Sequence, residues 1–298
     1  MPAPQFVRHV FSRLMRFFPK EHGKYSILTR IYFRWLAPSS TYVIVDDLHF
    51  GIRMNLDLSE YLQAHLFVFG SYELPTVRFL RRYLQRHDVV FDVGAQIGYL
   101  SLVMGKAAEG GTTIYSFEPE TTNAMRLRNN VQLNGLANVN IEQCALSDKT
   151  GTLKLFLSRD NNAGTHSTVF VEHNVSTDYI EIPATTIDAF VEARSIPRLD
   201  LIKIDVEGAE LEVILGGTRT LSRLFPVIVM ELSDGLQKSR DFTTQQLKAL
   251  LADRGYSSFR IDDDGSLRTS PVDEYHLNDN IAFIHSDNMD RARPLIRG

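Results

Sequence analysis

The sequence predicts an α/β fold, in which helices cover both faces of a mostly parallel, Rossmann-like sheet. From residue 89 onward, apolar strand-like runs alternate with segments of helical periodicity, and this alternation is typical of a parallel sheet. The stretch VVFDVGAQIG (89–98) places a glycine-spaced turn directly after a strand, as nucleotide-binding βα units do. The last two strand-like runs, residues 256–262 and 280–285, are close enough in the chain to pair antiparallel at one end of the sheet.

The composition excludes several classes of protein. With 44% apolar and 23% charged residues among 298, it is that of an ordinary globular protein. A net charge of −4 argues against broad nucleic-acid binding, which requires a basic surface. The single cysteine, Cys144, excludes an internal disulfide and a cysteine-rich zinc site and suits a reducing compartment, so we expect a cytoplasmic protein. We expect neither a membrane span nor a signal peptide, because no apolar run is long enough for either.

An N-terminal extension, residues 1–67, is predicted to precede the main domain. Residues 6–18 (FVRHVFSRLMRFF) predict a basic amphipathic helix with apolar side chains on one side and Arg, His and Ser on the other. Residues 1–36 carry seven Lys/Arg and one acid, so a peripheral membrane contact is one interpretation of this helix. We favour the other interpretation, in which the helix packs on the main domain. Residues 41–58 alternate apolar and polar side chains and predict a β-hairpin.

The main domain is predicted to span residues 68–298, and helices and strands alternate through its first part. Each predicted strand is a short run rich in β-branched and aromatic residues, and each predicted helix repeats apolar residues at helical spacing. Predicted helices cover residues 73–88, 97–108 and 120–135. Predicted strands cover residues 89–93, 112–119 and 139–146.

The alternation is interrupted at about residues 150–195, which we predict to be an insertion at one end of the sheet. It contains a strand (151–158), a polar loop (159–168), a second strand (178–186) and a short helix (187–194). The alternation then resumes with a strand (199–206), a helix (208–224), a strand (226–232) and a helix (243–255). Because loops at a sheet edge carry function, we expect residues 1–60 and 159–178 to shape the substrate pocket.

The glycine turn alone does not identify the nucleotide. Gly94 and Gly98 match a dinucleotide-binding turn only in part, because its third glycine is missing. Glu118 ends the next strand about twenty residues later, where an acid can accept hydrogen bonds from ribose hydroxyls. Enzymes that use NAD and enzymes that use S-adenosylmethionine both have such an acid. These residues therefore leave both cofactors open, and also a tight turn without a ligand.

A series of longer motifs discriminates between these cofactors. The chain contains, in this order, DVGAQIGYLS, FEPE, NNVQLNG, ALSD, NNAGTHS and LIKIDVEGAELEVILGG. This series, over roughly residues 68–285, resembles the FkbM-type methyltransferases, a family of S-adenosylmethionine-dependent enzymes associated with O-methylation. The resemblance implies a seven-stranded class I methyltransferase sheet with an antiparallel last strand. It also implies methylation of a hydroxyl on a small molecule, sugar or lipid-linked glycan.

The resemblance also implies roles for particular residues in binding the cofactor. Asp92, Gly94, Ala95 and Gly98 would face its methionine part, Glu118 its ribose, and Cys144 and Ala145 its adenine. GSYE (70–73) is similar to the segment that leads into the family's first core helix, and it places Glu73 at the cofactor site. Related enzymes often have an Asp where Cys144 stands, and a thiol is a weak hydrogen-bond acceptor. We therefore expect the backbone and the shape of the site to hold adenine.

Two acids mark the expected catalytic centre. In a doubly wound sheet, ligands bind beyond the carboxyl ends of the strands, and Asp205 and Glu207 end the fourth core strand. Asp205 is predicted to be a base or a substrate anchor, and Glu207 either a second anchor or an acid at a helix N-terminus. Glu210 is expected on the surface. His166, in the polar loop of the insertion, is a second candidate base.

Other ligands and functions are weaker interpretations of the same residues. Asp205 and Glu231 could share a divalent cation such as Mg²⁺, but paired acids at strand ends usually bind no metal, so we predict no metal site. The missing third glycine and the IDVEGAE segment (204–210) argue against an NAD-dependent oxidoreductase. The intact acids Asp92, Glu118 and Asp205 argue against a non-catalytic interaction module. The acceptor is expected to be a small molecule or glycan.

Overall fold

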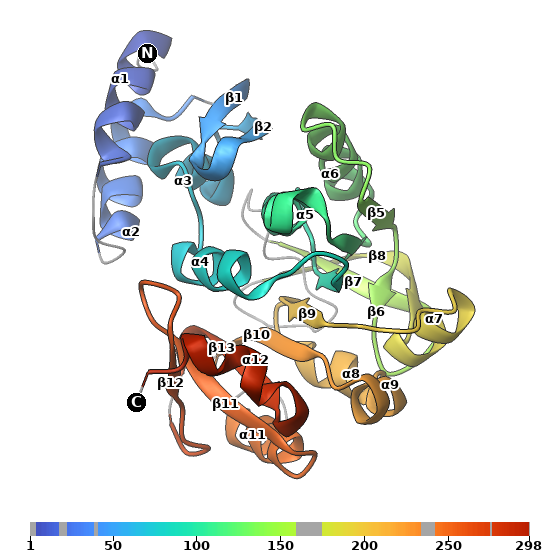
Figure 1. Cartoon of the computed structure of the whole chain (residues 1–298). Helices are drawn as coiled ribbons and strands as arrows, with labels where there is room; N and C mark the ends of the chain where they lie inside the picture. Colours follow the sequence, from blue (N-terminus) through green and yellow to red (C-terminus); the bar gives the residue numbers. More distant parts are fainter. Residues whose placement is uncertain are drawn as a thin grey trace.

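The fold is built around one eight-stranded mixed sheet (Figure 1). The computed structural model describes residues 4–17, 23–38, 41–158, 175–233, 242–274 and 276–297. The strand order is β12-β11-β13-β10-β9-β3-β4-β5. In chain order, these strands are β3 (Val89–Val93), β4 (Thr113–Phe117), β5 (Val139–Glu142), β9 (Leu201–Ile204), β10 (Val227–Ser233), β11 (Tyr256–Ile261), β12 (Leu267–Thr269) and β13 (Leu277–His285).

The predicted fold class is confirmed. Strands β10, β9, β3, β4 and β5 are parallel, and the last strand, β13, pairs antiparallel with β10 and with β11. Seven of the strands are those that the sequence predicts. The eighth, β12, is a three-residue edge strand that pairs with β11 and that the sequence analysis did not anticipate.

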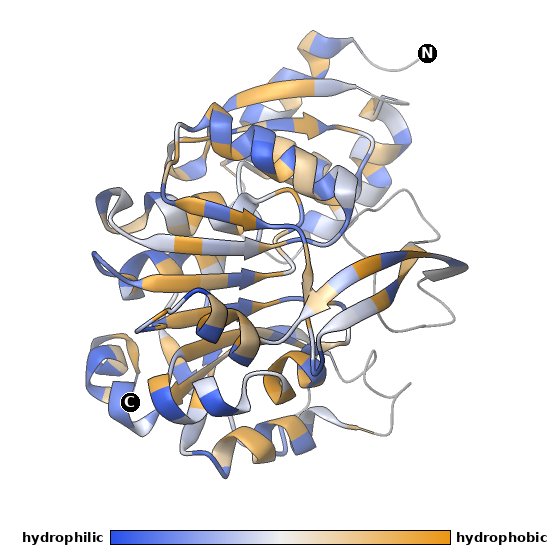
Figure 2. Cartoon of the chain, turned by 90° about the vertical axis from the view of Figure 1, so that its right-hand side faces the viewer, coloured by the Kyte–Doolittle hydropathy of each residue, from blue (hydrophilic) through white to orange (hydrophobic). Residues whose placement is uncertain are grey.

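Two hydrophobic cores lie on opposite faces of the sheet, because successive side chains along a strand point to opposite faces. Val90 of β3 belongs to one core, whereas its neighbour Phe91 belongs to the other. Figure 2 shows the apolar character of the central strands. The first core includes α4 (Leu74–Tyr83), α5 (Tyr99–Lys106) and α12 (Met289–Ala292). The second includes α7 (Ile187–Ala193), α8 (Glu210–Leu215), α9 (Thr218–Leu224) and α11 (Thr244–Ala252).

Two predicted elements are divided in the structure. The predicted helix 208–224 is two helices, α8 and α9, which meet at Gly216 and Gly217. A Cβ on Gly216 would lie 1.9 Å from the carbonyl oxygen of Ser147, so a close backbone approach requires this glycine. The predicted strand 139–146 is also two strands, β5 in the main sheet and β6 (Ala145–Leu146) in a smaller one.

The predicted insertion forms this smaller sheet, whose strand order is β6-β8-β7. Strand β7 (Gly151–Ser158) pairs antiparallel with β8 (Val175–Thr185), and β6 pairs parallel with β8. The hairpin projects beside the carboxyl edge of the main sheet (Figure 2). The predicted polar loop, including His166, lies outside the described residues.

The N-terminal extension packs on the main domain, and the two share one hydrophobic core. Helix α1 (Gln5–Met15) contacts α3 (Tyr61–Phe69), a helix that the sequence analysis did not predict. The predicted hairpin is present as β1 (Tyr42–Leu48) and β2 (Ile52–Asp57). Two backbone amides of β2 donate hydrogen bonds to the side chains of Asn130 in α6 (Thr121–Leu133) and of Asn134 directly after it. Between α1 and the hairpin lie α2 (Lys24–Ile27) and a π-helical segment, η1 (Leu28–Leu36). No helix among the described residues is long and apolar enough to cross a membrane.

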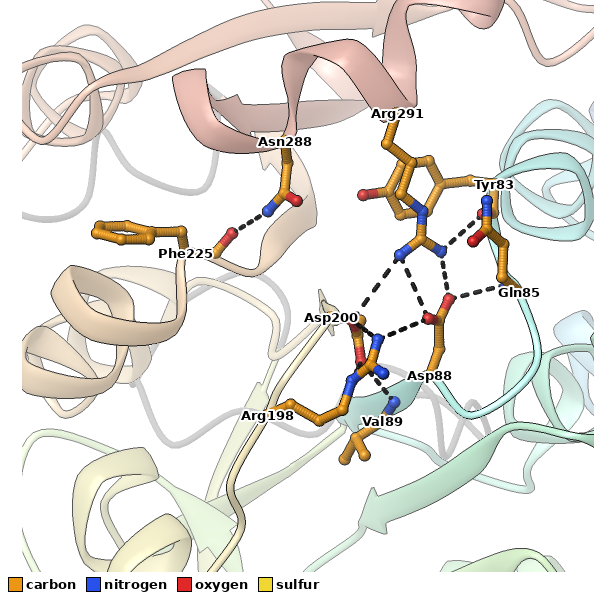
Figure 3. Close-up of polar contacts among 9 residues, drawn as sticks. All are labelled: Tyr83, Gln85, Asp88, Val89, Arg198, Asp200, Phe225, Asn288 and Arg291. Atoms are coloured by element: carbon orange, nitrogen blue, oxygen red, sulfur yellow. Dashed lines mark hydrogen bonds and ion pairs between the residues drawn. The ribbon is translucent and has the colours of Figure 1, made fainter.

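The amino edge of the sheet is closed by a network of charged groups (Figure 3). Asp88, just before β3, is buried and receives the guanidinium groups of Arg198 and Arg291, the latter carried by α12. Asp200, before β9, accepts the Val89 amide at 2.8 Å and pairs with Arg198 at 2.5 Å. This network attaches the C-terminal helix to the edge opposite the carboxyl ends of the strands, which is where ligands bind in this type of sheet.

Candidate active site

A cleft opens at the carboxyl edge of β3, β4 and β9, between the main sheet and the β6-β8-β7 sheet. Its lining includes several of the predicted cofactor residues together with both predicted catalytic acids of the fourth strand. The lining residues are Val93, Gly94, Gln96, Phe117, Glu118, Pro119, Asn123, Cys144, Ala145, Leu146, Leu155, Asp205, Val206, Glu207 and Ala209. The cleft volume of about 70 Å³ is below the roughly 300–1,000 Å³ of ligand pockets, so we expect its walls to move when a nucleotide-sized ligand binds.

Gly94 turns the chain at the end of β3 and faces the end of β9. Its φ is +84°, and a Cβ on this residue would lie 1.8 Å from the carbonyl oxygen of Asp205. Two physical features therefore require a glycine at this position, namely the left-handed backbone conformation and the close approach of the end of β9. The sequence analysis placed Gly94 beside the methionine part of the cofactor and anticipated neither feature. The amides of Gly94 and Ala95 both donate to the carbonyl of Phe117, which fixes the turn against β4.

Glu118 extends this arrangement from the end of β4. One of its carboxylate oxygens accepts the Gln96 amide at 2.8 Å, and the other accepts the Glu120 amide at 2.9 Å. Burial raises the pKa of Glu118 to about 7, although these two backbone donors oppose that shift. Because each carboxylate oxygen has two lone pairs, the group can accept further hydrogen bonds from a ligand in the cleft.

Cys144 and Ala145 line the far end of the cleft, between β5 and β6. Burial and the nearby carboxylate of Glu142 raise the pKa of the Cys144 thiol to about 11. The thiol is therefore protonated at neutral pH, and it presents a small, nearly apolar surface rather than a nucleophile.

Three other predicted cofactor residues do not line the cleft. Asp92 is buried and accepts a hydrogen bond from the hydroxyl of Ser101 on α5. Ala95 is buried beneath the turn. Gly98 begins α5 with a φ of +94°, and a Cβ there would lie 2.3 Å from Leu127 of α6. These residues hold the turn and its helix in place.

A row of polar side chains crosses the sheet on the face that carries α4 and α5. Asp92 of β3 lies opposite Lys203 of β9 in the register, and Glu231 of β10 lies opposite Asn280 of β13. The neighbours of these four residues along each strand belong to the core on the other face, so the polar side chains share one face. Burial raises the pKa of Asp92 to about 6 and that of Glu231 well above its usual value.

Lys203 is the centre of this row and is fully buried. Its ammonium group lies 3.5 Å from Asp205 Oδ2 and 3.9 Å from Glu73 Oε2. Burial alone would lower the pKa of Lys203, but the carboxylates of Glu73, Asp205 and Glu231 outweigh it and raise that pKa. The lysine is therefore a permanent cation that holds several acids together. The sequence analysis missed it, although a lysine inside the apolar strand LIKI is a signal, since buried lysines are almost always paired.

Asp205 and Glu207 follow β9 and both face the cleft. The Asp205 side chain is 30% exposed, so it is accessible to a ligand. Glu207 has a φ of +51°, a strained conformation for a residue other than glycine and one that is concentrated at functional sites. Burial raises the pKa of Glu207 to about 8, and the adjacent Asp205 contributes to this shift.

Glu210 is not on the surface as expected, because it is 4% exposed and accepts the Gly208 amide at 3.1 Å at the start of α8. Glu207 lies three residues before that helix and is not its N-terminal acid. Among the described residues, no three His, Cys, Asp or Glu side chains form a group that could hold a metal ion.

Glu73 lies on the other side of Lys203, in a second and larger cavity of about 790 Å³. It precedes α4 with a φ of +46° and does not line the cleft with the other residues that the resemblance assigned to the cofactor. The second cavity is strongly polar. Its lining residues are Glu73, Pro75, Thr76, Arg260, Ile261, Asp262, Asp263, Asp264, Asp279, Asn280 and Arg297. Lys203 therefore lies between Asp205, which lines the cleft, and Glu73, which lines this cavity.

Comparisons with known proteins give the family. The model of the FkbM methyltransferase domain matches residues 92–258, more than half of the chain. The chain is 27% identical over 184 residues to Methyltransferase 1 of Beauveria bassiana, covering 56% of this chain and 72% of that protein. It is 30% identical over 158 residues to the hexuronic acid methyltransferase AglP of Haloferax volcanii, covering 53% and 61%. It is 27% identical over 159 residues to the 31-O-demethyl-FK506 methyltransferase FkbM of Streptomyces tacrolimicus, covering 45% and 60%.

The chain thus spans less than two thirds of the last two relatives. Among solved structures, it is 17% identical to methyltransferase FkbM of Methylobacillus flagellatus, with a TM-score of 0.44, over 67% of this chain and 44% of that one. The family match includes the turn at Gly94, the acid Glu118 and the segment from Lys203 to Glu207, which line the cleft or bridge it to the second cavity. The chain belongs to the FkbM family of methyltransferases.

Proposed function

We propose that this chain is an S-adenosylmethionine-dependent O-methyltransferase whose acceptor is a hydroxyl of a small molecule, sugar or glycan. The observation that carries the proposal is the junction at Lys203. On one side, Asp205 lines the nucleotide cleft, and on the other, Glu73 lines a large polar cavity. Transfer between two bound molecules requires two adjoining sites that hold the donor and the acceptor in line.

The cleft residues fit S-adenosylmethionine. Glu118 has the lone pairs to bind both ribose hydroxyls while it keeps its two backbone donors. The weakly polar wall at Cys144 and Ala145 suits an adenine ring. When bound, the cofactor supplies a methyl group on a positively charged sulfur, which makes that methyl reactive.

The protein's part in the chemistry is to orient a hydroxyl and receive its proton. Asp205 is our first candidate, because it lines the cleft, is accessible and is held by Lys203. A carboxylate at this position can orient the hydroxyl or accept its proton as the oxygen attacks. Glu207 is the second candidate, since its pKa of about 8 is suited to proton transfer near neutral pH.

The second cavity supports a neutral, hydroxyl-rich acceptor. Its lining contains five carboxylates and two guanidinium groups. Both guanidinium groups are paired with acids, Arg260 with Glu274 and Asp279, and Arg297 with Asp264. Carboxylates accept hydrogen bonds from sugar hydroxyls, whereas the net negative charge repels an anionic acceptor. Two relatives named for a hexuronic acid and for 31-O-demethyl-FK506 support a hydroxylated acceptor in general.

The proposal predicts a specific pattern of binding and turnover. Calorimetry with the purified protein should detect binding of S-adenosylmethionine and none of NAD. A screen of acceptors should then find methylation of neutral sugars and alcohols, measured as release of S-adenosylhomocysteine. Matched uronic acids should react with a kcat/KM lower by roughly tenfold or more, since like charges in a partly buried site repel by over about 1 kcal/mol. Binding of NAD in place of S-adenosylmethionine would contradict the cofactor, and a preference for uronic acids would contradict the acceptor class.

A second prediction concerns Glu118 and pH. Its pKa of about 7 means that the carboxylate, the form that accepts ribose hydroxyl protons, is lost as the pH falls. We therefore expect cofactor affinity to be constant above pH 8 and to fall by roughly tenfold per pH unit below 7. Glu118→Gln should weaken binding by about 1–3 kcal/mol and flatten this pH dependence.

Glu120→Gln is the matched control for this variant. Glu120 also accepts two backbone amides, those of Thr122 and Asn123, but it does not line the cleft. Its variant should lose stability in a thermal melt while it keeps the affinity and the pH dependence of the wild type. Unchanged binding by Glu118→Gln across this pH range would remove Glu118 from the cofactor site.

A further inference from the structure

Helix α1 and the turn after it leave much of their apolar side exposed to solvent. The side chains of Phe6, Leu14 and Phe17 are 77%, 62% and 86% exposed, and those of Val7 and Val10 are about 40% exposed. These five residues are the outward face of α1. The sequence analysis favoured packing of this helix on the main domain, and its contacts with α3 confirm that packing. Its apolar side is divided, because Phe11 and Met15 pack against the core whereas the five residues of the outward face do not. Exposed apolar surface of this kind is unfavourable in water and marks a contact with another molecule or with a membrane.

Polar contacts on the opposite side of α1 explain its orientation. Arg8 and Ser12 are buried against the domain, with 7% and 2% of their surfaces exposed. The ring of His9 packs edge-on against Phe67 of α3, with 5.3 Å between the ring centroids. Arg16 binds Asp47 through a 2.7 Å ion pair. Rotating the helix to bury the outward face would break these contacts, so this face is held outward by specific interactions.

The N-terminal extension that carries this face also exposes basic residues. Residues 1–36 carry seven Lys/Arg and one acid, in a chain whose net charge is −4. Arg13 is exposed on α1, and η1 exposes Arg30 and Arg34 beside the chain's single tryptophan, Trp35, which is 69% exposed. The guanidinium of Arg34 lies over the Trp35 ring at 5.3 Å. Apolar and aromatic side chains combined with Lys/Arg are typical of helices that lie at the surface of an anionic membrane.

We propose that the N-terminal extension docks on an anionic lipid surface through the outward face of α1. A helix in this position buries its apolar side among the acyl chains while neighbouring cations contact the headgroups. Charge complementarity favours lipid over a second copy of the chain. A twofold contact through this face would bring two basic extensions together, which like-charge repulsion opposes. Figure 1 shows α1 at the outer edge of the molecule, where a flat surface can reach it.

Vesicle sedimentation with the full-length chain tests this proposal and needs no methyl acceptor. The chain should sediment with vesicles of phosphatidylcholine and phosphatidylserine much more than with phosphatidylcholine alone, and added salt should release it. The triple variant Phe6→Ser, Leu14→Ser, Phe17→Ser should lower binding by roughly tenfold or more. Arg13→Glu should also lower it. Because all of these side chains are exposed, the variants should keep the melting temperature of the wild type.

The matched control replaces exposed apolar residues of the main domain. Met125→Ser, Leu215→Ser and Val272→Ser change side chains that are 52%, 45% and 41% exposed, and they should leave vesicle binding unchanged. Equal sedimentation with neutral and anionic vesicles, or full binding by the triple variant, would overturn the proposal. So would a dimer in sedimentation velocity that the triple variant converts to monomer, because a second copy would then cover this face.

Discussion

Replacing Asp205 with Asn should lower kcat by about 10²–10⁴, the usual effect of losing a catalytic base, while cofactor affinity stays nearly unchanged. The substitution keeps the shape of the side chain at the end of β9 and removes the charge that Lys203 holds at 3.5 Å. If the Asp205 carboxylate had only a structural role, this substitution would lower the stability of the protein and leave turnover intact. Single-turnover kinetics with a saturating acceptor, together with calorimetric titration of the cofactor, measure the two quantities separately.

The pH profile distinguishes Asp205 from Glu207 as the base. The Asp205 charge helps to raise the pKa of Glu207 to about 8. If Glu207 is the base, the wild-type rate should rise with pH toward 8, and Asp205→Asn should move that rise to lower pH. If Asp205 is the base, the residual activity of the variant should lack such a rise.

Glu207→Gln is the companion variant, for which we expect a smaller loss of turnover than for Asp205→Asn. Methylation by Asp205→Asn at a nearly wild-type rate would contradict the assignment. Attention would then pass to Glu207 and to His166, the candidate in the loop outside the described residues.

Replacing Lys203 with Met should lower the free energy of unfolding by about 3–5 kcal/mol, the cost of leaving buried charges without their partner. Lys203 is fully buried and is the shared cation of Glu73, Asp205 and Glu231. Without it, the folded-state pKa values of Glu73 and Glu231 rise further above their unfolded values. Protonation relieves the repulsion at low pH, so the loss of stability should grow as the pH rises from 5.5 to 8. Urea unfolding at several pH values measures this dependence.

Lys248→Met is the matched control, since Lys248 is also buried. Its ammonium group binds the Ser270 hydroxyl, the Pro271 carbonyl and the His276 ring, and it helps to lower the pKa of Glu274, a carboxylate that therefore stays ionised over this pH range. This variant should be destabilised by an amount that does not rise with pH over the same range, and it should keep its affinity for the cofactor. A Lys203→Met protein that is as stable as the wild type at pH 8 would contradict this prediction, because it would show that the neighbouring acids are protonated when Lys203 is absent.

The nucleotide side of the site was largely predictable from the sequence. Gly94 and Glu118 stand at fixed distances along consecutive βα units, and parallel strands bring their carboxyl ends to one edge of the sheet. Local spacing therefore determines that they meet, and the structure has both in the wall of the cleft. Spacing did not distinguish residues that face the cleft from those that support it. Asp92 and Gly98 belong to the same motif, but Asp92 bonds to Ser101 and Gly98 lies against Leu127, both away from the cleft.

The other side of the site depends on the register between strands that are distant in the chain. Asp92 lies opposite Lys203, and Glu73 arrives from the start of α4, so residues more than a hundred positions apart form one charged group. No local period encodes such pairings. The large polar cavity between α4, β11 and β13 has the same origin and could not be located from the sequence.

By itself, the sequence determined the alternating βα order, the mostly parallel sheet, the glycine turn with its acid, and the family. These features follow from backbone preferences and side-chain periods that act over a few residues. Only the tertiary structure decided which side of α1 faces the domain, that helix 208–224 divides at Gly216, and that Lys203 lies between Asp205 of the cleft and Glu73 of the second cavity. Each of these depends on contacts between segments distant in the chain, where the fit of specific polar and backbone groups outweighs the local hydrophobic pattern.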